Sequence, residues 1–169
     1  CEKFTDIDPR AAEGLLKHVV SLYEDKTGDL WIGTFRQGII RYRQGNQRFE
    51  RFDIQSRLGQ QVSHNNITAI SGDKHGKIWF ATLYAGLLGY DINSDKLQQF
   101  LPKTLDQVVK AIRGLEVDHQ GNLWLATKFD GLWQFNRQSQ RFNQHVATAA
   151  DGIPAALYSV MQDQQNQLW

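Results

Sequence analysis

The stretch VVSLYEDKTGDLWIGTFRQGIIRY, residues 19–42, decides the fold because its pattern returns at residues 67–90 and 112–135. Tryptophans mark the repeat: Trp31, Trp79, Trp124 and Trp169 stand 48, 45 and 45 residues apart. Each follows an Asp by six residues and a Gly or Asn by three; in the first three copies a Thr comes three residues later and a Gly seven later. Coincident spacings of this kind indicate an internal structural repeat.

Each period predicts four β-strands. The first is apolar and β-branched, as a strand buried on both faces should be. An Asp-x-x-Gly turn follows it, in which Gly, or Asn166 in the fourth copy, supplies the positive φ of a tight hairpin. The expected strands are 19–24, 30–34 and 39–43 in the first copy, 67–71, 78–82 and 87–91 in the second, and 112–117, 123–127 and 132–136 in the third, with a strand at 157–161 and polar fourth strands around Arg51-Phe52, Gln99-Phe100 and Arg141-Phe142.

These strands predict an all-β chain, a fragment of a β-propeller with four-stranded antiparallel blades. Hydrophobicity falls from the first strand to the fourth, as expected when the first strand lines a central axis. A β-helical solenoid uses shorter coils. We expect a preceding blade's outer strand and a run-in at 1–18, blades at 19–66, 67–111 and 112–156, and a further blade beginning at 157–169. A ring closed by residues 1–6 joining 157–169 is the alternative, and it would lack one strand.

Composition excludes several classes of function. The formal net charge is +1, which gives no basic field for nucleic acid. Cys1 is the sole cysteine, so an internal disulfide and a thiolate metal cluster are excluded; a lipidated first residue is an alternative for Cys1. No apolar run is long enough to span a bilayer. Because a propeller fragment exposes its terminal blade faces, we expect neighbouring blades or a second copy to cover them.

The candidate ligand site lies at positions that differ between the copies, between repeated residues that do not differ. Between Thr and Gly the three copies carry residues 35–37, 83–85 and 128–130, in a loop that joins the second and third strands. Loops on a rigid scaffold are common binding sites, and the alternative is that these are simply solvated residues. The candidate ligand-binding residues are Arg36, Gln37, Tyr84, Lys128, Phe129 and Asp130, with His64 and Asn65 from the following connection on the same predicted face.

Catalytic signatures are lacking. The sequence has no Gly-x-Ser-x-Gly elbow, no phosphate-binding glycine loop and no histidine pair with zinc spacing. His75 and His119 fall inside Asp-x-x-Gly turns and are interpreted as solvated. Residues 91–95 imitate the start of a calcium loop, but Lys96 and Pro102 replace the required Gly and Glu. We therefore predict no catalytic residue, no metal and no cofactor.

Residues 19–42 closely resemble the two-component regulator propeller repeat, and the copies at 67–90 and 112–135 match it at the Asp, Gly, Trp, Thr, Gly and aromatic positions. Gly14, Leu15 and Leu16 resemble the run-in that precedes such blades. Trp-Asp strand ends and double glycines, typical of WD and kelch blades, are absent.

The resemblance implies a periplasmic or extracytoplasmic sensor region of a bacterial inner-membrane protein. A histidine kinase, hybrid kinase or diguanylate cyclase would supply the output, and an oligosaccharide or another small molecule would be the ligand. Two alternatives remain. One is a propeller lyase similar to streptogramin lyase, for which His64 with Asp130 is the loose candidate pair. The other is a non-catalytic interaction scaffold.

Overall fold

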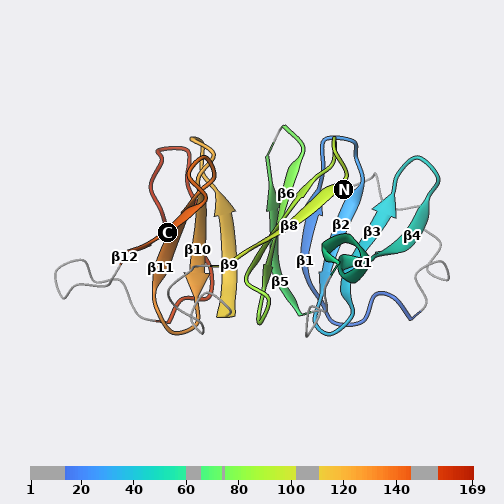
Figure 1. Ribbon diagram of the computed structural model, residues 1–169, viewed down its shortest axis with the longest axis horizontal. Helices are drawn as coiled ribbons and strands as arrows, with labels where there is room; N and C mark the ends of the chain where they lie inside the picture. The colour runs from blue at the N-terminus through green and yellow to red at the C-terminus, as the bar shows by residue number, and fades with distance from the viewer. Residues whose placement is uncertain (1–13, 60–65, 74, 102–110, 146–155) are drawn as a thin grey trace.

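Three antiparallel sheets of four strands stand side by side in the computed structural model (Figure 1). The structure describes residues 14–59, 66–73, 75–101, 111–145 and 156–169. Strand order within each sheet follows the chain, so each sheet is a series of hairpins. We call the sheets blades 1 to 3. Blade 1 consists of β1 (Val19–Glu24), β2 (Leu30–Thr34), β3 (Gly38–Arg43) and β4 (Arg48–Phe52), and blade 2 of β5 (Ile67–Gly72), β6 (Lys77–Thr82), β7 (Leu87–Asp91) and β8 (Lys96–Phe100). Blade 3 consists of β9 (Ile112–Val117), β10 (Leu123–Thr127), β11 (Leu132–Asn136) and β12 (Arg141–His145). The all-β class and the four-stranded antiparallel blades are confirmed.

The Asp-x-x-Gly turns are held by their own aspartates. In blade 1, Asp25 Oδ1 accepts hydrogen bonds from the backbone N–H of Thr27 at 2.8 Å and of Asp29 at 3.2 Å. Gly28 has φ 86°, and Asn166, at the matching position of the fourth copy, has φ 64°. The left-handed backbone that the sequence predicts at this position is therefore present in both.

Apolar side chains fill the two junctions between blades. The first junction contains Trp31 and Phe52 from blade 1 and Phe80 and Tyr90 from blade 2. The second contains Trp79 from blade 2 and Phe135 from blade 3, with ring centroids 5.7 Å apart. The tryptophans of the first two copies therefore pack each blade against the next one.

The first strands are the innermost ones, since β1 contacts β5 and β5 contacts β9. A first strand is buried on its outer face only where a preceding blade covers it. Ile70 of β5 and Leu115 of β9 are 8% and 6% exposed, whereas Leu22, at the same position of β1, is 59% exposed. The expectation that the first strand is buried on both faces is therefore wrong for β1, because no described segment covers its outer face.

Two features differ from the sequence predictions. A short helix, α1 (Ile54–Leu58), follows β4; Asp53 caps its start by accepting from the Ser56 N–H, and Gly59 ends it at φ 65°. The strand expected at 157–161 is not formed: the fourth copy shows only a bridge between Gln162 and Leu168. Apart from one backbone hydrogen bond from Leu157 to Thr127 of blade 3, at 2.9 Å, the backbone pairing of this segment is with its own hairpin partner.

The outer strand expected within residues 1–6 lies outside the described residues. The described helix is too short and too polar to cross a membrane.

Candidate functional site

The loop between the second and third strands of each blade is built around a threonine hydroxyl. Thr34, Thr82 and Thr127 each donate that hydroxyl to the carbonyl of the Gly four residues later, at 2.8 Å in all three blades. The same oxygen accepts the N–H of the third loop residue, at 3.1, 2.8 and 3.1 Å for Gln37, Ala85 and Asp130. This pair of bonds explains why Thr and Gly recur four residues apart.

A side chain from the fourth strand holds the same loop from the other side. The carbonyls of Gln37, Ala85 and Asp130 accept hydrogen bonds from Arg51, Gln99 and Gln144 at 3.3, 2.8 and 3.1 Å. The backbone of the third loop residue is therefore fixed from two directions. These bonds use backbone atoms of the loop, so none of the three loop side chains takes part in them.

The Gln37 side chain hydrogen-bonds the segment of the chain that precedes blade 1. Its side-chain amide donates to the Gly14 carbonyl at 2.9 Å, and its amide oxygen accepts the Lys17 N–H at 3.2 Å. The side chain predicted to bind a ligand is thus already engaged in tying residues 14–17 to blade 1. The sequence could not show this, because the partners are backbone atoms 20 and 23 positions away.

Each of the three loops presents one exposed aromatic ring. Phe35, Tyr84 and Phe129 are 37%, 48% and 61% exposed. The Lys128 ammonium lies 4.5 Å from the centroid of the Phe129 ring, and the Arg36 guanidinium lies 5.7 Å from that of Phe35. Arg36 also has φ 84°, in the left-handed region that non-glycine residues rarely adopt. The structure therefore combines flat apolar faces with cations at this end of the blades.

Asp130 is half-buried beside Phe129, at the third position of its loop. His64 and Asn65 lie outside the described residues. Within the described ranges, no three His, Cys, Asp or Glu side chains gather as metal ligands would.

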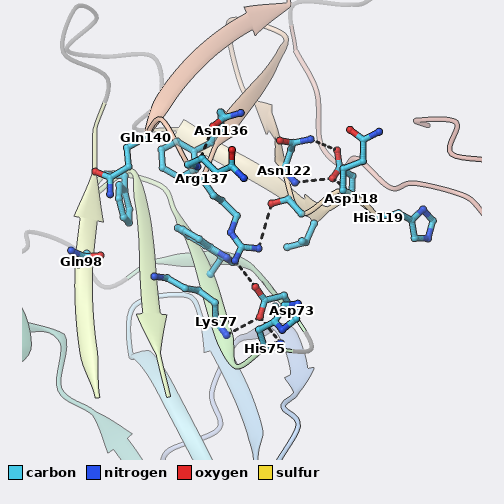
Figure 2. A pocket seen from close by; sticks show the side chains of 18 residues that line it. Asp73, His75, Lys77, Gln98, Asp118, His119, Asn122, Asn136, Arg137 and Gln140 are labelled. Carbon is cyan, nitrogen blue, oxygen red and sulfur yellow. Dashed lines mark hydrogen bonds and ion pairs between the residues drawn. The ribbon is translucent and has the colours of Figure 1, made fainter. Parts of the chain in front are cut away.

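A second hollow lies at the opposite end, between blades 2 and 3 (Figure 2). Its volume is about 870 Å³, and it is bordered by the Asp-x-x-Gly turns of both blades and by the turn between β11 and β12. In it, Arg137 pairs with Asp73 across the blade junction at 2.7 Å. The sequence interpretation of these turns as merely solvated overlooked this cleft.

Comparison with known proteins identifies the repeats. The family model described as the two-component regulator propeller matches residues 15–36 and 61–84. In these two stretches the chain is similar to the two-component regulator propeller repeat. Both matches run from the approach to a first strand to the aromatic-bearing loop, so they contain the complete Asp, Gly, Trp and Thr frame of blades 1 and 2.

Solved structures show how these propeller repeats are arranged. The extracellular domains assigned to two hybrid two-component systems of B. thetaiotaomicron, BT3049 and BT4673, both match with TM-score 0.70. Identities are 19% and 20%, over 89% and 90% of this chain and 21% and 19% of theirs. Virginiamycin B lyase from Staphylococcus aureus matches with TM-score 0.66 and 13% identity, over 89% of this chain and 47% of that one.

At these identities the similarity establishes the fold, and the chain is a fragment of a β-propeller. It spans about a fifth of the length of the two extracellular domains. No curated protein matches the chain in sequence.

Proposed function

We propose that these blades belong to the extracytoplasmic, ligand-sensing propeller of a bacterial signal-transduction receptor. The two-component regulator propeller repeats support this role, and so does the similarity in fold to extracellular domains assigned to hybrid two-component systems. Catalytic output from a histidine kinase or diguanylate cyclase, and a membrane anchor, would then reside elsewhere in the parent protein.

The observation that carries the proposal is the exposed ring in each of the three loops. Tyr84 and Phe129 stand on backbones fixed by Thr82 and Thr127, so their positions are set by the scaffold. A rigid platform lowers the entropy lost on binding. The loops therefore offer a preorganised surface for a ligand that spans neighbouring blades.

The ligand class we propose is an oligosaccharide. Sugar rings have apolar C–H faces that pack on aromatic rings, and hydroxyl groups that need hydrogen-bonding partners. Phe129 would supply the flat face, while Lys128 and Asp130 beside it would supply a donor and an acceptor. Arg36 would play the same part beside Phe35 in blade 1.

A thermal-shift screen of this chain against oligosaccharides tests the proposal, because a ligand that binds the folded state raises the melting temperature. Phe129→Ala and Tyr84→Ala should each weaken binding about tenfold or more. Tyr158→Ala is the matched control, because Tyr158 is 73% exposed but lies outside the three loops. If no oligosaccharide stabilises the chain, the proposal fails in favour of an interaction scaffold. Equal losses in all three variants would also contradict it.

Lyase activity does not gain similar support. The likeness to virginiamycin B lyase is one of fold, and the pair that a lyase reading would use includes His64, which lies outside the described residues. We therefore base no catalytic proposal on Asp130.

We also propose that another blade of the same repeat covers the outer face of β1. Val20 and Leu22 are 48% and 59% exposed there, while Ile70 and Leu115, the counterparts of Leu22, are buried by a preceding blade. Such a blade can come from the parent protein or from a second copy of the chain. Sedimentation of this chain should reveal self-association that Leu22→Glu abolishes; a monomer at all concentrations would rule out the second copy.

A further inference from the structure

The hydrogen bond between the repeated tryptophan and the repeated aspartate is broken in one blade. In three copies the indole N–H donates to the Asp six residues earlier: Trp31 to Asp25 at 2.7 Å, Trp124 to Asp118 at 2.9 Å and Trp169 to Asp163 at 2.8 Å. In blade 2, Trp79 Nε1 is buried and has no hydrogen-bond partner among the described residues. A buried donor without a partner is unfavourable, so this exception calls for a physical cause.

Arg137, which comes from the turn between β11 and β12 of the next blade, lies beside the oxygen that would accept the Trp79 N–H. Its Nη2 lies 2.7 Å from Asp73 Oδ2, the oxygen that accepts the indole N–H in the other copies. Figure 2 shows the guanidinium reaching across the cleft to Asp73. The other carboxylate oxygen, Oδ1, already accepts the backbone N–H of His75 and of Lys77, each at 2.9 Å. Arg137 is therefore ion-paired with the oxygen that the Trp79 indole would use, and that oxygen accepts no hydrogen bond within the described part of the chain.

Asp118, the other carboxylate that borders the cleft, is satisfied by its own surroundings. Asp118 accepts four hydrogen bonds: from the backbone of Gln120 and Asn122, from the Asn122 amide and from the Trp124 indole. The His119 ring is also engaged, with Nδ1 2.7 Å from the Asn166 amide oxygen. These groups offer little to a ligand in the cleft.

The two cations that border the cleft, Lys77 and Arg137, have fewer hydrogen-bonding partners than Asp118. Lys77 Nζ lies 5.8 Å from the Trp79 ring and forms no hydrogen bond or ion pair among the described residues. Apart from Asp73, Arg137 has one long hydrogen bond, 3.4 Å from Nη1 to the Gly121 carbonyl, and its guanidinium lies 5.8 Å from the centroid of the Trp79 ring. Lys77 and Arg137 thus border the same cleft from opposite blades, with spare donors on both.

We propose that the cleft between blades 2 and 3 binds a small anionic ligand carrying a carboxylate or phosphate group. Arg137 and Lys77 hold the anion, and Arg137 leaves Asp73 as it does so. Asp73 Oδ2 then accepts the Trp79 indole N–H, which restores the bond found in the other three copies. The guanidinium fork suits either anion geometrically, and two cations from different blades make the site specific to this junction. This site lies at the opposite end of the blades from the sensing loops and does not rest on the proposed function.

The indole N–H resonances provide a direct test. The chain has five tryptophans, and Trp79→Phe assigns the resonance of Trp79. Titration with inorganic phosphate and, separately, with succinate, at constant ionic strength, should move that resonance downfield to saturation. Arg137→Gln should produce the same downfield movement with no anion added, because it frees Asp73.

Affinity for each anion is followed in parallel through the backbone amides of Gly121 and Asn136. Lys77→Gln and Arg137→Gln should each bind at least about tenfold more weakly, as expected for a lost charge-assisted hydrogen bond. Arg48→Gln is the matched control: Arg48 is an exposed arginine at the start of β4, away from the cleft.

Saturation by phosphate alone would assign a phosphate-bearing ligand, and saturation by succinate alone a carboxylate. The proposal is overturned if neither anion saturates the resonance, or if Lys77→Gln and Arg137→Gln bind as tightly as Arg48→Gln. It is equally overturned if Arg137→Gln, with an otherwise unchanged spectrum, leaves the Trp79 resonance where it was.

Discussion

Trp31 and Trp79 occupy the same position in successive repeats and are 0% and 1% exposed, yet they are held in different ways. Trp31 is surrounded by polar partners: its N–H binds Asp25, and the Arg41 guanidinium lies 4.7 Å from its ring. Trp79 faces Gly89, which stands where Arg41 stands in blade 1. A Cβ at Gly89 would lie 2.6 Å from Trp79 Cζ3, so the indole occupies the space that a side chain would need.

The comparison shows that a repeated residue fixes a packing position without fixing the bonds around it. In the first junction the indole has polar partners on one side, Asp25 and Arg41, and Arg41 forms an ion pair with Asp29 at 2.7 Å. In the second junction Gly89 removes the arginine and Lys77 replaces Asp29. That junction consequently retains an open cleft and an unsatisfied indole, into which the next blade sends Arg137.

Asp29→Ala should have the largest effect. Asp29 and Arg41 are both nearly buried, and a buried arginine that loses its partner destabilises a protein by about 3–5 kcal/mol. Lys77→Ala, the matched substitution in blade 2, should cost about 0.5 kcal/mol or less, because that ammonium has no ion pair. Urea unfolding of the two variants measures the difference. Equal losses would mean that the polar network of the first junction contributes no special stability.

Exchange of each indole for a phenyl ring tests the hydrogen bond itself. Trp31→Phe removes a donor from the buried Asp25 carboxylate, whereas Trp79→Phe removes a donor that has no partner. We expect Trp31→Phe to be more destabilising by about 1.5–3 kcal/mol, the usual contribution of a hydrogen bond to a charged group. Chemical denaturation followed by far-ultraviolet circular dichroism gives both values. A larger loss in Trp79→Phe would reverse the comparison.

Gly89→Ala should lower stability by about 1–3 kcal/mol, since the new methyl group would overlap the Trp79 ring and force it to move. Gly45→Ala is the control, because no atom lies within 4 Å of a Cβ placed there. Thermal unfolding ranks the two variants. If Gly89→Ala is as stable as Gly45→Ala, the glycine is not what distinguishes the two junctions.

Acidification should give the smallest effect. Burial acts to raise the pKa of Asp25, but hydrogen bonds from Thr27 and Trp31 outweigh it and hold the pKa below the usual 3.8. A carboxyl with a lowered pKa stabilises the folded state above its unfolded-state pKa, and this stability is lost as the pH falls through its folded-state pKa.

Trp31→Phe removes one of those hydrogen bonds, so it should lose less stability between neutral pH and about pH 3 than the parent chain. Trp79→Phe should lose as much as the parent. Urea midpoints at the two pH values provide the measurement. If acidification lowered the free energy of unfolding equally in all three proteins, Asp25 would be excluded as the titrating group.

The strands could be predicted because the bonds that define them are local. Asp25 caps a turn four residues long, and Thr34 closes a loop through the carbonyl four residues ahead. Such contacts produce a periodic pattern in the sequence. Both bounds were predicted for nine of the twelve described strands, and these nine agree with the expected ranges to within one residue. Helix α1 left no such trace, because it occurs after blade 1 without a described counterpart.

The candidate sites could be predicted only in part. The loop positions follow from the repeat, although the ligand-binding role of Arg36, Tyr84, Lys128, Phe129 and Asp130 stays a prediction. Pairing of Asp73 with Arg137 could not be foreseen, because the two residues are far apart in the sequence and belong to different blades. The single clue was Gly89, which breaks the pattern set by Arg41 and Gln134.

The threonine-centred loops have a consequence for how such a scaffold can change. Each loop is closed by its own threonine, Thr34, Thr82 or Thr127, and by the glycine four residues later. The first two of the three positions between them can therefore be exchanged as a unit. Substitutions at 35–36, 83–84 and 128–129 can then diversify recognition while the blades stay intact. Mutational libraries confined to those six positions would be a natural route to propellers with new specificities.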